Sequence, residues 1–294
     1  MFPDRRGLSR AENCAEGDPD MRMKRSACII LALALLFSSA AADNGRNADE
    51  LMNVLVCGLI RDEDGTRAGL IMVLSANTRR GGVRLAFING DLAATDGEKT
   101  DRLSALYDAV GPDGMAAVLS GILDARIRRY VTVDMNGFCA AVDAFGGVEI
   151  TLDEEEAAAV SAACGEEVLP GAATLNGSQA FAYVRLRGGD QAPGNDRKRV
   201  FLSAMVEKTL RSPDIGSLLS VADQLLPNIE TSLTLSDMMS IAIAYLAGWS
   251  GRLETCSIPA PGEYTSAEGE LGGIVLKDEH AAAESFWQFV QPNP

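Results

Sequence analysis

The sequence predicts a layered α/β domain, and three observations support this fold class. Short apolar runs with strand-like character alternate along the chain with segments of helical periodicity. No internal repeat and no long linker interrupts the alternation, which favours one large domain over two small ones. The chain has 294 residues, of which 47% are hydrophobic and 23% charged, so it is long enough to bury a full core.

The first half of the chain alternates strands and helices in a regular order. Apolar runs bounded by turn residues indicate strands, and apolar residues three and four apart indicate helices. Gly111-Pro112 breaks one helical pattern, and Gly146-Gly147 ends another before a strand. The expected strands are 52–60, 69–76, 83–89, 130–135 and 148–152, and the expected helices are 102–107, 115–123 and 137–145.

The second half contains several short helices with clear start signals. Asn176 is placed to cap a helix, and Gln179 three residues later nearly completes a reciprocal capping box. The acidic run at 153–156 is typical of a helix start, and Thr234 or Ser236 is expected to cap a later helix. We expect the apolar side chains of 238–246 to pack in the core rather than to wall a lipid groove. The remaining expected elements are helices at 198–210, 214–225, 235–247 and 279–290 and strands at 253–258 and 273–276.

The charge of the chain restricts its partners. Lys and Arg number 26 against 41 Asp and Glu, which gives a formal net charge of −15. A surface this acidic repels nucleic acid and anionic lipid headgroups, so neither is expected as a general partner. An anionic ligand must therefore be held by a local group of basic residues, and 185–199 is the densest such segment after the leader.

Residues 1–42 read as a leader that begins with a polar extension. Its basic segment 21–25, apolar segment 27–37 and small residues 38–42 follow the order of an export signal. The apolar run is shorter than the roughly 20 residues that span a bilayer, which favours a cleaved signal over a retained anchor. We therefore expect residues 43–294 to form an extracytoplasmic domain, either secreted or anchored at the outer face of the cytoplasmic membrane.

Cysteine and histidine usage argues against two kinds of site. Cys57, Cys139, Cys164 and Cys256 are widely spaced and show no CxxC pattern, which argues against zinc. One disulfide remains open in an oxidising exterior, but spacing cannot name its pair. The single histidine, His280, lies near the C-terminus, so Ser/His or Cys/His catalysis has little support.

The segment 170–187 carries the strongest functional signal. Arg185 and Arg187 are two residues apart, so they share a face in an extended chain but not on a helix. Two adjacent guanidinium forks suit a diphosphate or a pair of carboxylates. The pattern alone is equally compatible with an exposed strand end whose arginines are solvated.

Several segments of the chain resemble the LytR-CpsA-Psr family, also described as the cell envelope-related transcriptional attenuator domain. LNGSQAFAYVRLR (175–187) is similar to the family motif Leu-Asn-Gly-x-x-Ala-Leu-x-Tyr-x-Arg-x-Arg. The segment 128–150 resembles Tyr-x-x-Val-Asp-x-x-Gly-Phe-x-x-x-Val-Asp-x-x-Gly-Gly-Val, and 69–91 aligns without a gap to the second and third strands of the family. The other similar segments are 53–60, 258–265 and 271–279, so the likeness spans about residues 50–290.

The resemblance implies both a fold and an activity. The implied fold is a three-layer α/β/α domain with a mixed central sheet flanked by helices. The implied ligand is a polyprenyl-diphosphate-linked glycopolymer, with arginines on the diphosphate, acidic residues placing Mg²⁺ and the lipid in an apolar cavity. The implied reaction transfers the glycopolymer to peptidoglycan, and the guanidiniums and the metal neutralise the charge of the leaving group.

Three residues carry the implied site by direct motif match, and a fourth retains the charge of the family residue. Arg185 and Arg187 take the positions of the two arginines in the Tyr-x-Arg-x-Arg motif, which implies diphosphate binding. Asp91 takes the position of the aspartate in the family's Pro-Arg-Asp, which implies a catalytic and metal-binding role. Arg102 stands where the family commonly has lysine, and it retains the positive charge.

A second basic segment, DRKRVFLSAM (196–205), resembles a downstream family stretch, Arg-Gln-Arg-x-Phe-Leu. Arg197 takes an arginine position and implies a further diphosphate contact, and Lys198 replaces the family's glutamine. A short deletion near Asn195 is as compatible with the alignment as a gapless match. The roles of Asp196 and Arg199 therefore stay ambiguous.

The chain departs from the family motifs at two functional positions. Asn89-Gly90 replaces the Pro-Arg that precedes the aspartate, and the family's second-strand aspartate falls on Gly69. Losing one positioned charged donor commonly costs on the order of 10²–10³ in rate. The leading prediction is therefore an exported protein that binds the lipid diphosphate with transfer reduced or lost. The alternatives are an active Mg²⁺-dependent phosphotransferase and a non-enzymatic envelope scaffold.

Overall fold

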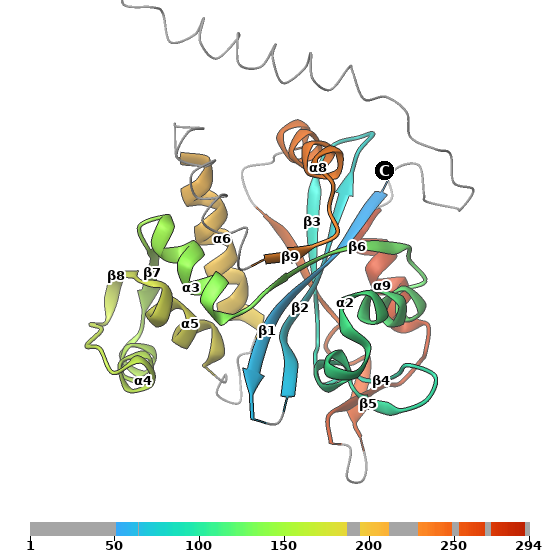
Figure 1. Ribbon diagram of the computed structural model, residues 1–294, viewed down its shortest axis with the longest axis horizontal. Coiled ribbons are helices and arrows are strands. Elements are labelled where there is room, and N and C mark those ends of the chain that lie inside the picture. Colours follow the sequence, from blue (N-terminus) through green and yellow to red (C-terminus); the bar gives the residue numbers. More distant parts are fainter. Residues whose placement is uncertain are drawn as a thin grey trace, which may run out of the picture. The chain divides into compact units, whose positions relative to one another are not determined.

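The computed structural model describes residues 51–63, 65–186, 195–211, 229–248, 253–267 and 272–291. By its internal contacts the chain divides into two units, Met1–Ala42 and Asp43–Pro294, and every described residue belongs to the second unit. This unit is a mixed β-sheet with helices on both faces (Figure 1). The α/β class and the flanked mixed sheet predicted above are therefore confirmed.

The central sheet has six strands in the order β10-β3-β2-β1-β6-β9. The pairs β1–β2, β2–β3 and β6–β9 are antiparallel, whereas β1–β6 and β3–β10 are parallel. The sequence predicted all of these strands except β9, which has three residues and shows no readable period. Their bounds are β1 Leu51–Asp62, β2 Gly65–Asn77, β3 Val83–Ile88, β6 Ile127–Val133, β9 Ile229–Thr231 and β10 Glu254–Ile258.

Three two-stranded sheets accompany the central sheet. They pair β4 Ala93–Thr95 with β5 Thr100–Arg102, β7 Val148–Leu152 with β8 Gly171–Leu175, and β11 Tyr264–Ser266 with β12 Ile274–Leu276. The sequence predicted β7 and β12 but not β4, β5, β8 or β11. The missed strands are short and rich in small or polar residues, so no alternation of apolar side chains marks them.

One face of the central sheet packs against α2 Leu103–Ile122 and α9 Ala281–Val290 (Figure 1). Alternate side chains of β1, among them Leu55, Cys57 and Leu59, are fully or almost fully buried in this core. Within α2, Gly111 has non-helical φ 64° and ψ −171° and is followed by Pro112, so the predicted break is present as a kink between two helical segments.

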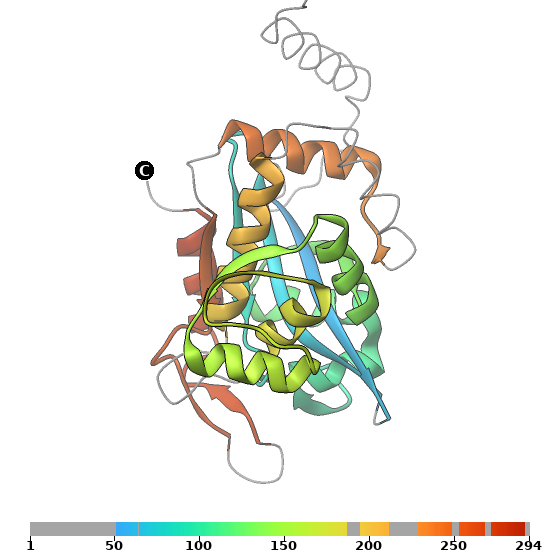
Figure 2. The same cartoon turned by 90° about the vertical axis from the view of Figure 1, so that its left-hand side faces the viewer.

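The opposite side of the sheet carries a layer with a core of its own. This layer contains the antiparallel pair β7–β8 and the helices α3 Met135–Ala144, α4 Glu154–Cys164, α5 Gly177–Arg185 and α6 Asn195–Arg211. Reciprocal capping boxes begin α4 at Asp153–Glu156 and α5 at Asn176–Gln179, which confirms both predicted helix starts. Figure 2 shows α6 running beside the strands of the central sheet.

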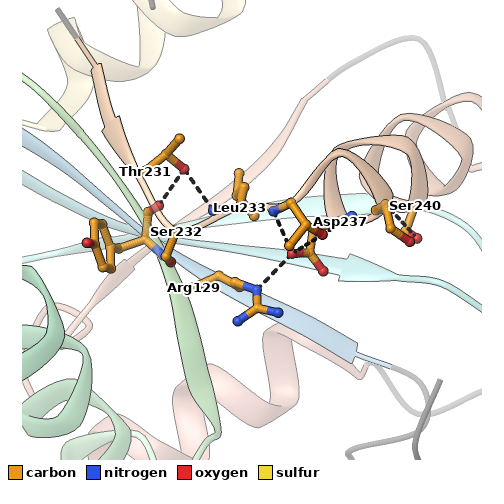
Figure 3. Close-up of polar contacts among 9 residues, drawn as sticks. Arg129, Thr231, Ser232, Leu233, Asp237 and Ser240 are labelled. Atoms are coloured by element: carbon orange, nitrogen blue, oxygen red, sulfur yellow. Dashed lines mark hydrogen bonds and ion pairs between the residues drawn. The ribbon is translucent and has the colours of Figure 1, made fainter.

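Helix α8 Leu235–Ala247 begins at Thr234, which caps it in a third capping box with Asp237. Arg129 of β6 donates from Nε to Asp237 Oδ2 at 2.8 Å, so the start of α8 is tied to the central sheet (Figure 3). Met238, Ile243 and Leu246 are exposed, and the expectation that this segment packs in the core is wrong for them. Ala244 is the buried side chain of α8, because only that side of the helix meets the ends of β2 and β3.

The described residues also bear on the disulfide and on the membrane anchor that the sequence leaves open. Cys57, Cys139, Cys164 and Cys256 are all free thiols, so no disulfide joins them in this structure. None of the helices in the described ranges is long and apolar enough to cross a membrane. The predicted leader and the predicted helix 214–225 lie outside the described residues.

Candidate functional site

Asp91 and Arg102 meet just beyond the end of β3. The backbone N–H of Asp91 donates to Asn89 Oδ1 at 3.0 Å, and its carbonyl accepts from Ile274 at 2.9 Å, which holds the loop. Arg102 Nη1 lies 3.7 Å from Asp91 Oδ1, and the two side chains are 42% and 60% exposed. The structure thus brings together two of the residues that the resemblance assigned to the site.

Lys198 is the third charged residue at this place. It projects from α6, and its Nζ donates to the backbone carbonyl of Gly69 at 3.1 Å. Burial lowers the pKa of Lys198, and the nearby Asp91 carboxylate offsets part of that effect. We call Asp91, Arg102 and Lys198 the head-group site.

The position of Lys198 was not predicted as functional. The sequence signal was its place between Arg197 and Arg199, three consecutive basic residues at the start of an amphipathic helix. Successive helix positions point in directions about 100° apart, so the three side chains cannot all reach the same partner. Lys198 and Arg199 both reach strands of the central sheet, and the docking of α6 decides that Lys198 is the one that reaches β2.

Gly69 lies in a bulge of β2. Gly58 pairs with Leu70 and Leu59 pairs with Ala68, so Gly69 has no partner residue in the β1–β2 register. A bulge leaves its extra residue outside the ladder of hydrogen bonds. The carbonyl of Gly69 is therefore available to accept from Lys198.

The two family departures differ in the room they leave for a side chain. A Cβ on Gly69 would clash with the Cδ1 and Cγ1 atoms of Ile60, so this side chain fills the space of the family's aspartate. A Cβ on Gly90 would lie 3.3 Å from Ser104 Cβ and 3.8 Å from the carbonyl oxygen of Ala68. The two glycines are thus neighbours in space, and the loss of charge is concentrated at one spot.

An apolar surface leads away from the head-group site across the second face of the central sheet. On β1, Val56, Gly58 and Ile60 point away from α2 and are only half-buried. The alternate residues of the same strand, on the face toward α2, are buried: Leu55, Cys57 and Leu59. The neighbouring β2 repeats this with half-buried Leu70 and Leu74. Neither of the two hydrophobic cores contains Val56, Ile60, Leu70 or Leu74, so we treat these residues as a separate apolar strip. Met72, which lies between Leu70 and Leu74 on β2, is buried.

Arg185 is the last residue of α5 rather than part of an extended segment. Its guanidinium lies 5.2 Å from the ring centroid of Phe181, four residues earlier, and the side chain is exposed. The expected extended pair with Arg187 is therefore not formed at Arg185, because the capped helix continues through it. Arg187 itself lies outside the described residues.

The other basic residues of α6 are directed to different partners. Arg197 donates from Nε to Glu156 Oε1 at 2.7 Å, and the two side chains are 18% and 16% exposed. Arg199 donates from Nε to Thr255 Oγ1 at 2.9 Å and from Nη2 to the Thr255 carbonyl at 3.2 Å. The side chain of Asp196 lies outside the described residues, and the assignment of these three residues to the ligand stays a prediction.

The described residues do not by themselves form a magnesium site. They contain no group of three or more His, Cys, Asp or Glu side chains placed to hold a metal. Mg²⁺ prefers several oxygen ligands in octahedral geometry. The neighbours of Asp91 in the head-group site are instead two cations, Arg102 and Lys198.

Fold and site together define a mixed α/β protein with a small charged site at one end of an apolar sheet face. The sequence model of the LytR_cpsA_psr family matches residues 31–285. The chain therefore belongs to the LytR_cpsA_psr family, as its motifs predicted.

Curated relatives carry the names of teichoic acid transferases. Residues of this chain are 27% identical over 252 positions to the polyisoprenyl-teichoic acid–peptidoglycan teichoic acid transferase TagU of Bacillus mycoides (strain KBAB4), covering 83% of this chain and 75% of the relative. The similar transferase TagV of Bacillus subtilis (strain 168) is 28% identical over 169 residues, covering 56% of this chain. That match spans 43% of the length of TagV.

Solved structures show the same fold. The crystal structure of Bacillus subtilis TagV superposes with a TM-score of 0.66 at 20% identity, covering 84% of this chain and 99% of the chain in that structure. The family protein YwtF (TagT) with bound octaprenyl pyrophosphate lipid superposes with a TM-score of 0.64 at 18% identity, covering 85% and 94% of the two chains. These likenesses support the architecture described above, a mixed sheet between helical layers.

Proposed function

We propose that this protein is an exported cell-envelope protein that binds a polyprenyl-diphosphate-linked glycopolymer, with transfer to peptidoglycan reduced or lost. The observation that carries the proposal is the convergence of Asp91, Arg102 and Lys198 at one end of the half-buried apolar strip. A lipid diphosphate has this same division into a charged head and an apolar chain. The octaprenyl pyrophosphate bound by the related TagT belongs to this ligand class.

The charge of the chain makes a local site necessary. A protein with net charge −15 repels a diphosphate at long range, so binding depends on cations placed within a few ångströms of the phosphates. Two donors at the head-group site, the guanidinium of Arg102 and the ammonium of Lys198, meet this requirement. Burial of isoprene units on the second sheet face adds about 25 cal/mol per Å² of apolar surface.

Reduced transfer follows from what Gly69 and Gly90 no longer supply. Each replaces a charged family residue, and Ile60 occupies the space at Gly69. Each missing charged group is expected to cost on the order of 10²–10³ in rate, because it no longer stabilises charge that develops in the transition state. Binding survives such losses better than catalysis, since the ground-state contacts of Arg102 and Lys198 remain.

An active Mg²⁺-dependent phosphotransferase is the second candidate. The observation that favours it is Asp91, whose carboxylate is retained and 60% exposed. In that case the substrate phosphates would have to supply most of the metal ligands. Turnover of a lipid-linked saccharide with peptidoglycan as acceptor tests this candidate: Mg²⁺-dependent turnover that Asp91→Ala abolishes would replace our proposal.

The binding proposal is tested by titrating the purified protein with a polyprenyl diphosphate and, in parallel, with the prenyl alcohol of equal chain length. We expect clear preference for the diphosphate, because the head-group site recognises its charge. Equal affinity for both lipids, or no binding of either, would refute the proposal. The double variant Arg185→Ala, Arg187→Ala then measures whether the family arginines add to the head-group site.

The proposed ligand also implies a location. A polyprenyl-diphosphate glycopolymer and peptidoglycan meet at the outer face of the cytoplasmic membrane, so we place the protein there, membrane-proximal and outside the cytoplasm. Protease treatment of intact, wall-free cells tests this, since an extracytoplasmic domain is digested while a cytoplasmic marker is spared. Protection of the protein to the same degree as the marker would contradict the placement.

A further inference from the structure

We propose that the ammonium group of Lys198 takes the place of a divalent metal in the head-group site, so that this protein binds its diphosphate ligand without Mg²⁺. The inference rests on the proposed function and names the cation of the same site. It concerns a residue of this chain that the motif comparison does not assign to the ligand.

The first step is the oxygen environment that Lys198 occupies. The bulge frees the Gly69 carbonyl, and Asp91 lies close enough for its carboxylate to act on the Lys198 charge. A carbonyl and a carboxylate are both ligands of the kind that Mg²⁺ accepts. The Lys198 ammonium already sits at the carbonyl, and its positive charge disfavours a dication at the same spot.

The second step is the donor capacity that remains. An ammonium group has three N–H donors. The hydrogen bond from Lys198 to the Gly69 carbonyl uses one of them. A phosphate oxygen that entered beside Asp91 and Arg102 would find the remaining donors in a half-buried environment, where charge-assisted hydrogen bonds are strongest.

The third step is the cost of keeping the charge. Burial of Lys198 disfavours its charged form and lowers its pKa, and the Asp91 carboxylate offsets only part of this effect. The basic residues around it, Arg102 at the site and Arg197 and Arg199 on α6, do not relieve that cost. A diphosphate would relieve it, so ligand binding and the retention of this cation support each other.

The obvious alternative is that Lys198 only satisfies the bulge carbonyl. The chain offers a matched control for it, because Lys208 on the same helix donates to the carbonyls of Gly146 and Gly147 at 3.1 and 2.7 Å. Both Lys198→Met and Lys208→Met therefore remove a lysine-to-carbonyl contact of α6. Only Lys198→Met removes a cation from the head-group site.

The experiment measures polyprenyl diphosphate binding to the purified full chain in EDTA and in MgCl₂, with thermal unfolding of each variant as a check on folding. We expect wild-type affinity to be the same in both buffers. Lys198→Met should weaken binding by about 10- to 100-fold in both, Lys208→Met should bind as wild type, and Lys198→Arg should recover most of the loss.

The outcomes distinguish a failure of the Lys198 role from a failure of the proposed function. Wild-type binding that requires Mg²⁺, or full affinity in a folded Lys198→Met, overturns this inference and leaves the proposed function standing. A wild-type protein that binds no polyprenyl diphosphate in either buffer overturns both. If Lys198→Met does not fold, Lys198→Gln carries the same comparison, and unchanged affinity in that variant is equally decisive against the role of Lys198.

Discussion

At the scale of the residue, Arg102 has a buried donor that a phosphate ligand would satisfy. Its guanidinium lies at the outer limit of an ion pair with Asp91, and its Nε is buried without a hydrogen-bond partner in the described part of the chain. A buried donor without a partner is costly, and a phosphate oxygen is a suitable acceptor.

We predict that Arg102→Gln weakens polyprenyl diphosphate binding about tenfold, because one charge-assisted hydrogen bond is lost. Lys99→Gln is the matched control, since Lys99 forms an exposed ion pair with Asp101 on the same β4–β5 hairpin. Lipid titration of the two variants measures the difference. Equal affinities would remove Arg102 from the site.

Arg197 is expected to behave in the opposite way. Its ion pair with Glu156 joins α6 to α4, and both side chains are largely shielded from water. We predict that Arg197→Gln lowers the free energy of unfolding by about 2 kcal/mol, because it leaves a shielded carboxylate unpaired, and changes lipid affinity little. Urea unfolding and lipid titration test the two parts, with Glu156→Gln as the partner variant. Lost affinity at full stability would return Arg197 to the ligand, as the family resemblance implies.

At the scale of the element, the start of α8 depends on one carboxylate. Burial alone raises the pKa of Asp237, but hydrogen bonds from Thr234 and Arg129 outweigh it, and the pKa is lowered. A lowered folded-state pKa means that the ionised form stabilises the fold above the ordinary carboxyl pKa. This contribution is lost as the pH falls through the folded-state value.

We therefore predict that Asp237→Asn lowers the free energy of unfolding by about 1 kcal/mol at neutral pH. Below about pH 4 the difference in unfolding free energy between this variant and the wild type should become smaller, because the wild type loses the Asp237 charge. Thermal unfolding of both proteins across the acid range measures this gap. Ser240→Ala is the control on the same helix, because its hydroxyl only donates to the Ser236 carbonyl and does not titrate. A gap that stays constant with pH would contradict the role of the Asp237 charge.

At the scale of the whole molecule, net charge opposes the ligand that the site attracts. We predict that association of a short, water-soluble prenyl diphosphate becomes faster when ionic strength rises from about 0.01 to 0.1 M, where the screening length falls from about 30 to 10 Å. The reason is that screening removes the long-range repulsion of the −15 chain before it weakens contacts of a few ångströms. Stopped-flow rates test this, and slower association at higher salt would show that the local cations dominate the field.

The whole fold shows which of its elements could be predicted from the sequence. The strands of the central sheet other than β9, the helix starts at 153–156 and Asn176, and Thr234 as one of two possible caps were predicted. Periodicity and capping are set by residues within a few positions of each other. The exposed side of α8 was missed. The apolar sequence of this helix indicates that it packs against other elements, but it does not show which side of the helix does so. The short strands β4, β5, β8, β9 and β11 carry too few residues to show a period.

The sequence by itself determined the family, the order of the main elements and the replacement of two charged family residues by Gly69 and Gly90. Only the tertiary structure decided how the three consecutive basic residues at the start of α6 divide their partners. Lys198 reaches a carbonyl 129 positions earlier in the chain and Arg197 a carboxylate 41 positions earlier. Such pairs form because helix α6 packs across the sheet at one rotation about its axis, and that rotation is fixed by the burial of many side chains together rather than by any local signal.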